Sequence, residues 1–119
     1  MHELSVCLAL LDKVMSIAEE REARRVTRIE LTVGPLSGIE IDLLENAWPI
    51  ASAGTLADGA DFLVDAAPIV VHCSRCGKES SAQSNRLVCG HCDAYQTRVV
   101  TGDEMILQRV ELETSADPG

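Results

Sequence analysis

The chain of 119 residues has few aromatic side chains, little basic charge and no long apolar run. Phe, Trp and Tyr occur once each, so the core has to be built from aliphatic side chains. Ten Lys and Arg stand against 19 Asp and Glu, which gives a formal charge of −9. A nucleic-acid binder needs a basic face to neutralise phosphates, so nucleic acid is not expected as a partner.

We expect neither a secretory signal nor a membrane span in this chain. No apolar segment is long enough to span a bilayer, and the start has neither the apolar stretch nor the cleavage site of a secretory signal. We therefore expect no membrane insertion and a cytoplasmic location. Cysteines in that compartment bind metals or act in catalysis more often than they form disulfides.

Four of the five cysteines form two CxxC pairs, Cys73 with Cys76 and Cys89 with Cys92, separated by 12 residues. Two such turns present four thiolates to one tetrahedral Zn²⁺. Gly77 follows the first pair and Gly90 lies inside the second, where a tight turn needs positive φ or an exposed amide. Four protein ligands leave no open coordination position, so we expect a structural zinc and no catalysis.

Two other classes of protein use CxxC motifs. A zinc-ribbon adaptor of transcription or translation would need a basic face. Residues 68–102 carry only four Lys and Arg against two acids, a small excess of positive charge. A zinc ion bound by four thiolates is negatively charged as a whole and cancels this excess. A thiol oxidoreductase would need a reactive cysteine of low pKa and no tightly held zinc. The charge count therefore argues against the adaptor, and the paired CxxC spacing favours a bound zinc over a redox motif.

Apolar periodicity predicts an α+β fold with two helices and a small sheet. An amphipathic helix covers the first 20 residues, and its apolar stripe consists of Leu4, Cys7, Leu8, Leu11, Val14, Met15 and Ala18. A second helix is expected over 40–47, with Pro49 ending or kinking it. The expected strands are 26–33, 61–65, 69–71, 98–100 and 104–112.

The zinc motif falls between two of these strands, which predicts an insertion. The expected domains are a discontinuous α+β domain of residues 1–67 and 103–113, and a zinc-ribbon-like domain of residues 68–102. Residues 114–119 are polar and are expected to form a disordered tail.

The N-terminus is a second candidate metal site. The α-amine of Met1, the amide nitrogen of His2 and its imidazole Nδ1 can form fused five- and six-membered chelate rings. A deprotonated amide favours a square-planar ion, Ni²⁺ or Cu²⁺, and its binding weakens as pH falls. The fourth donor would be Glu3, another side chain, water or a partner. Helical phase places His2 away from the core, and an incidental histidine at the chain end is the alternative.

Three further residues are possible ligands by type. Cys7 lies on the apolar stripe and is expected to be a small core residue rather than a soft metal ligand. His72 and His91 neighbour the zinc cysteines, and we expect them to tune hydrogen bonding or solubility rather than replace a thiolate.

These features together resemble the HypA/HybF family of hydrogenase nickel-incorporation proteins. The resemblance runs from residue 1 to about residue 112. Besides the CxxC pairs, it is carried by Met1-His2-Glu3-Leu4-Ser5, Val33-Gly34-Pro35-Leu36-Ser37-Gly38, Ala53-Gly54-Thr55-Leu56-Ala57-Asp58-Gly59-Ala60 and Gly102-Asp103-Glu104-Met105. Some relatives carry a histidine just after a CxxC pair, where this chain has Gly77 and Asp93.

The resemblance implies a metallochaperone that delivers Ni²⁺ for assembly of the [NiFe]-hydrogenase active site, and in some organisms to urease. It implies a nickel site at Met1, His2 and Glu3, with zinc at Cys73, Cys76, Cys89 and Cys92. The implied partners are the GTPase HypB and the hydrogenase large-subunit precursor. A homodimer stays open as an alternative to a monomer.

Overall fold

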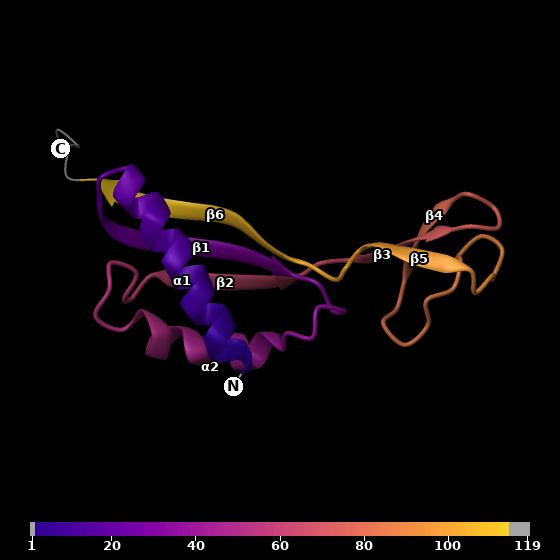
Figure 1. Cartoon of the computed structure of the whole chain (residues 1–119), viewed down its shortest axis with the longest axis horizontal. Helices are drawn as coiled ribbons and strands as arrows, with labels where there is room; N and C mark the ends of the chain where they lie inside the picture. The colour runs from indigo at the N-terminus through magenta and orange to yellow at the C-terminus, as the bar shows by residue number, and fades with distance from the viewer. Residues whose placement is uncertain (1, 115–119) are drawn as a thin grey trace. The chain divides into compact units, whose positions relative to one another are not determined.

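The computed structural model describes residues 2–114, with the backbone alone at His2 (Figure 1). The elements are, in order, α1 (His2–Glu20), β1 (Ala23–Val33), α2 (Ile41–Ser52), β2 (Asp61–Ala66), β3 (Ile69–Cys73), β4 (Glu79–Ala82), β5 (Thr97–Thr101) and β6 (Met105–Thr114). They form two three-stranded sheets with strand orders β2-β1-β6 and β4-β3-β5. The predicted α+β class is confirmed. The predicted tail lies almost entirely outside the described residues.

The chain divides into two compact units. The first unit comprises residues 1–31, 40–64 and 107–119, and the second comprises 32–39 and 65–106. These bounds differ from the expected domains chiefly because residues 32–39 join the second unit. Whether 68–102 is a domain in its own right stays a prediction. None of the helices among the described residues is long and apolar enough to cross a membrane.

In the first unit, α1 packs against α2, and both supply side chains to an aliphatic core. Four apolar residues of α1 are buried at spacings of three and four, namely Cys7, Leu10, Val14 and Ala18. Leu8 was expected in this stripe, but its side chain is 51% exposed, so that prediction was wrong. Leu10 occupies the core position instead, because the buried seam runs along an adjacent face of the helix.

The second helix is longer than expected. It runs to Ser52 with Pro49 inside it, so the prediction that the helix ends near Ala47 was wrong. Proline removes one amide donor from the helical ladder, but packing beyond that point compensates. Trp48 and Ser52 are both buried, and the Trp48 ring stacks on Phe62 with centroids 4.5 Å apart. Trp48 therefore anchors α2 to β2 and is not part of the protein surface.

The second unit contains the sheet that carries the first CxxC pair. β3 pairs antiparallel with β4, which places His72 opposite Glu79, and with β5 on its other side. β4 was not expected from the sequence. A close junction joins Gly34 to the segment before β6: the Gly34 amide donates to the Glu104 carbonyl, and the Leu36 amide donates to the Gly102 carbonyl, both at 2.7 Å.

Candidate metal centre

The four predicted zinc ligands come together at one end of β3 and in the loop that precedes β5. The Sγ atoms of Cys73, Cys76, Cys89 and Cys92 all lie within 4.8 Å of one another. Cys73 Sγ is 3.7 Å from Cys92 Sγ, and Cys76 Sγ is 3.6 Å from Cys89 Sγ. A tetrahedral zinc with Zn–S bonds of about 2.3 Å requires sulfurs about 3.8 Å apart. The thiols therefore fit a zinc ion.

The two CxxC turns are built alike. In each turn, the amide of the residue after the second cysteine donates to the carbonyl of the first: Gly77 to Cys73 at 2.9 Å, and Asp93 to Cys89 at 3.0 Å. Both donors adopt positive φ, 76° at Gly77 and 61° at Asp93. Positive φ was expected at Gly77 and is found there. Gly90 does not need it; its amide donates to Ser80 Oγ at 2.9 Å.

Backbone amides point at two of the sulfurs. The amides of Arg75 and Cys76 donate to Cys73 Sγ at 3.3 and 3.4 Å, and the His91 amide donates to Cys89 Sγ at 3.3 Å. Such hydrogen bonds stabilise a thiolate. The Cys76 amide is the main cause that lowers the pKa of Cys73, and the His91 amide is the main cause that lowers the pKa of Cys89 to about 6.

Cys92 behaves differently. The Ala94 amide acts to lower the pKa of Cys92, but burial and the three neighbouring sulfurs outweigh it and raise this pKa to about 12. The protein alone therefore does not favour four thiolates at neutral pH. A bound Zn²⁺ supplies the positive charge that allows all four cysteines to be ligands.

Neither histidine beside the cysteines joins the thiol cluster. Among the described residues, the cluster consists of the four cysteines. His91 Nε2 lies 3.2 Å from the Glu79 carbonyl and donates to it, since a carbonyl only accepts. His72 is half-buried in β3. Both arrangements agree with supporting roles around a complete set of four cysteine ligands.

Replacing Gly77 by Ala tests the turn geometry. An L-residue in the left-handed region costs about 1–2 kcal/mol, and no heavy atom lies within 4 Å of the added Cβ, so strain is the whole effect. We expect zinc affinity, measured by chelator competition, to fall about five- to thirtyfold. Asp93→Gly is the control: Asp tolerates the left-handed region better than Ala, so removing its smaller strain should raise affinity only slightly. Equal affinities in the two variants would contradict the strain argument.

The structure describes the N-terminal candidates only in part. Met1 and the side chain of His2 lie outside the described residues. Glu3 is described: it is 9% exposed, and its Oε2 accepts a hydrogen bond from the Glu40 amide at 3.2 Å. Glu40 directly precedes α2 and caps it without a side-chain hydrogen bond. The buried position of Glu3 was missed, although it lies four residues before Cys7 on the same face.

Cys7 is a core residue, as expected. Its side chain is fully buried, and its Sγ donates to the Leu44 carbonyl at 3.5 Å. Burial, followed by the charge of Glu3, raises the pKa of the Cys7 thiol to about 11. A neutral buried thiol is a poor metal ligand, because metals bind the thiolate.

A mixed α+β fold with a four-cysteine zinc centre defines a small zinc-containing protein. Comparison with known families is more specific: residues 1–112 match the family described as hydrogenase/urease nickel incorporation, metallochaperone, HypA. The chain therefore belongs to the HypA family of nickel-incorporation metallochaperones, which confirms the resemblance noted in the sequence.

Individual relatives agree. The chain is 45% identical to the hydrogenase maturation factor HypA of Nitrosospira multiformis, covering 97% of this chain and all of that protein. It is 34% identical to the factor of the same name from Aquifex aeolicus, covering 95% and 98%. The fold is similar to the solution structure of the Ni metallochaperone HypA from Helicobacter pylori, with a TM-score of 0.71 over 94% of this chain and 97% of that chain, at 20% identity.

Proposed function

We propose that this chain binds Ni²⁺ at its N-terminus and delivers it during assembly of the [NiFe]-hydrogenase active site, while zinc holds the second unit folded. The observation that carries the proposal is the family match over residues 1–112, which includes Met1-His2-Glu3. Hydrogenase is favoured over urease because the similar proteins from Nitrosospira and Aquifex are both hydrogenase maturation factors.

The proposed ligands are the Met1 amine, the His2 amide nitrogen and the His2 imidazole. The position of α1 supports this set. The helix begins at His2, and the amides of the first turn of a helix have no carbonyl partner within it. Deprotonating the His2 amide to bind nickel therefore breaks no helical hydrogen bond. Glu3 adds negative charge beside the metal, which offsets the positive end of the helix dipole.

Glu3 has a further role in this proposal. Its hydrogen bond to the Glu40 amide ties the first turn of α1 to the start of α2. This tie fixes the first turn of α1 against the segment before α2. Glu3 is thus proposed to position the site, whether or not its carboxylate also reaches the ion.

The test compares untagged protein with His2→Ala. We expect both to retain one zinc per chain, because the four cysteines are untouched. Nickel affinity, measured by calorimetric titration, should fall at least tenfold in the variant, since it loses the imidazole donor and with it the six-membered chelate ring, and keeps only the amine and amide nitrogens. His72→Ala removes a histidine elsewhere and should leave nickel affinity unchanged. Equal nickel affinity in wild type and His2→Ala would refute the site.

A second variant, extended by a few residues before Met1, removes the α-amine from its place. Loss of the square-planar nickel absorption band is expected, and its persistence would mean that the amine is not a ligand.

The partners and cellular setting are part of the same proposal. We propose the GTPase HypB and the hydrogenase large-subunit precursor as partners, a cytoplasmic location, and a carrier role without catalysis. Four cysteine ligands leave zinc no open position for a substrate, which supports the last point.

A further inference from the structure

An apolar groove lies in the first unit between the start of α1 and an exposed side of α2. Its volume is about 240 Å³, and it is lined by Glu3, Leu4, Leu43, Asn46, Ala47 and Ile50. Two of the lining leucine and isoleucine side chains are open to solvent, Leu43 at 46% and Ile50 at 71% exposure. We call this surface the α1–α2 groove.

The groove exists because α2 has two apolar faces. One face is buried in the core and carries the apolar residues Leu44 and Trp48, with the polar Ser52 buried near its end. A second stripe, Leu43, Ala47 and Ile50, has the i, i+4, i+7 spacing of a single helix face, and it lines the groove. On a helix that packs on one side only, the second face would be polar. This pattern is typical of a helix with a second packing partner.

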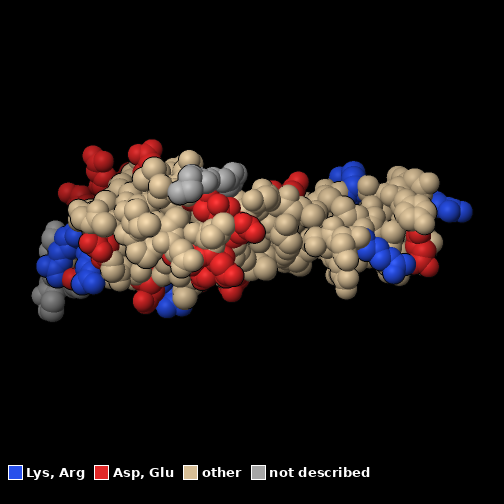
Figure 2. Space-filling model, turned by 90° about the horizontal axis from the view of Figure 1, so that it is seen from below, with Lys and Arg blue, Asp and Glu red and all other residues tan. Residues whose placement is uncertain are grey.

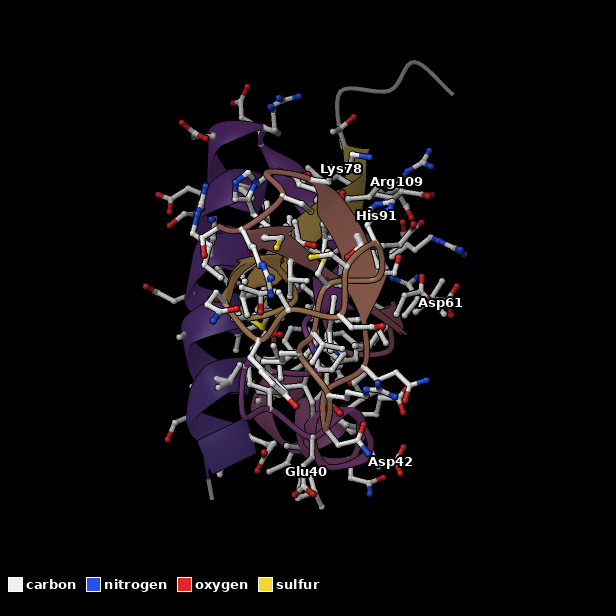
Figure 3. The ribbon with its side chains drawn as sticks, turned by 90° about the vertical axis from the view of Figure 1, so that its right-hand side faces the viewer. Glu40, Asp42, Asp61, Lys78, His91 and Arg109 are labelled. Atoms are coloured by element: carbon white, nitrogen blue, oxygen red, sulfur yellow. The ribbon has the colours of Figure 1, made fainter. Side chains whose placement is uncertain are left out.

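The surroundings of the groove are acidic. The chain has no Lys or Arg between Arg28 and Arg75, and three acids of this stretch, Glu40, Asp42 and Glu45, lie at the start of or within α2, the helix that lines the groove. Figure 2 shows a group of acidic side chains on one face of the first unit. Glu40 and Asp42 lie together at the start of α2 (Figure 3), and Glu45 is exposed on the same helix.

We propose that the α1–α2 groove docks an amphipathic helix of a partner protein that carries Lys or Arg beside its apolar residues. Apolar anchors spaced by three and four residues would fill the groove, as in other helix-in-groove complexes. The basic residues would meet the acidic rim, which speeds association and selects against acidic partners.

A second copy of this chain is a poor occupant. Its described helices are both acidic: α1 has one Lys against four acids, and α2 has two acids and no basic residue. Packing either helix into the groove would bring like charges together.

The surface also does not depend on nickel, so this inference is separate from the proposed nickel site. The groove nevertheless begins at Glu3, next in sequence to His2, and a docked partner would lie beside the proposed cargo.

The test uses the full zinc-loaded chain and a synthetic helical peptide of about 18 residues. The peptide has Leu along one face and Lys at all other positions. Calorimetry should show binding, and amide chemical shifts should change at α2. Leu43→Asn with Ile50→Asn should raise the Kd at least tenfold. Leu56→Asn is the matched control, because Leu56 is 41% exposed but lies outside the groove, and it should change the Kd less than twofold.

Two further comparisons test the charge. A peptide with Glu in place of Lys should bind at least tenfold more weakly. Asp42→Asn with Glu45→Gln should raise the Kd of the Lys peptide severalfold at low salt, and the difference should vanish at high salt. The proposal is overturned if the Lys peptide does not bind, if both peptides bind equally, or if the groove variant binds like the wild type. It is also overturned if Ile50→Asn converts a dimer to a monomer, since a second copy would then fill the groove.

His2→Ala separates the two proposals. It should leave binding of the Lys peptide unchanged, whereas the groove variant should keep its nickel affinity. Failure of peptide binding would therefore refute the groove proposal and not the nickel site. Failure of nickel binding would refute the nickel site and not the groove proposal.

Discussion

Cys89→Ser is expected to abolish zinc binding and unfold the second unit while the first unit stays folded. The buried cluster at the thiols consists of Cys73, Cys89 and Ala94, and outside it the strands of the sheet β4-β3-β5 bury only two apolar residues, Ile69 and Val71. A core of this size does not stabilise a fold without an additional cross-link such as a disulfide or a structural metal. Structural zinc contributes about 10–16 kcal/mol of binding free energy in small zinc domains, so its loss decides the outcome.

The measurement is zinc content by metal analysis together with amide signals of the two units. Zinc content should fall from one ion per chain to nearly none, because a serine hydroxyl does not replace a thiolate ligand. Cys7→Ser is the matched control. It makes the same chemical change in the core of the first unit, and it should lower the stability of that unit by about 1–2 kcal/mol with zinc fully retained. Zinc loss in Cys7→Ser, or zinc retention in Cys89→Ser, would show that the ligand set is wrong.

Gly34→Ala is expected to cost about 3 kcal/mol or more of folding stability. A Cβ at this position would lie 2.1 Å from the Gly102 carbonyl oxygen and 2.7 Å from the Asp103 nitrogen. Both are backbone atoms, so no side chain can rotate away. The two segments would have to separate, and the hydrogen bonds from the Gly34 and Leu36 amides would be lost at about 0.5–1.5 kcal/mol each, in addition to the steric strain.

Chemical denaturation of the zinc-loaded variants would measure this cost. Gly38→Ala is the control four residues away: its φ is 81° and its added Cβ meets no heavy atom within 4 Å. Its folding stability should fall only by about 1–2 kcal/mol, the cost of holding an Ala in the left-handed backbone region. Amide exchange at positions 34 and 36 should accelerate in Gly34→Ala and stay unchanged in Gly38→Ala. Similar costs for both would mean that the junction is more adaptable than its geometry implies.

Much of the fold could be predicted from local pattern. The first helix follows from its 3.6-residue period, and the zinc cluster follows from cysteine spacing, since two CxxC turns leave few other ways to place four thiols. The apolar pattern was less informative where two nearby residues of the same type could each occupy one core position. Both Leu8 and Leu10 lie in an apolar-rich helix, and only the packing of α1 on α2 decides that Leu10 is buried.

Other features depend on tertiary contacts that a sequence does not display. β4 has polar side chains at Glu79, Ser80 and Ser81, so it lacks alternation and forms because β3 offers an open edge. Pro49 continues a helix because the flanking Trp48 is held by Phe62. At the candidate site, the position of Glu3 beside the Glu40 amide could not be predicted from the sequence, because the two residues lie 37 positions apart and meet only in the folded chain.

The scarcity of aromatic residues has a practical consequence. The one Trp, Trp48, lies buried in the first unit, and the one Tyr, Tyr95, belongs to the second unit and is 83% exposed. Indole emission, excited selectively at the red edge of the absorption band, therefore reports on the first unit alone. The chain carries a built-in optical label that distinguishes unfolding of the helical unit from loss of the zinc-bound one, without any added dye.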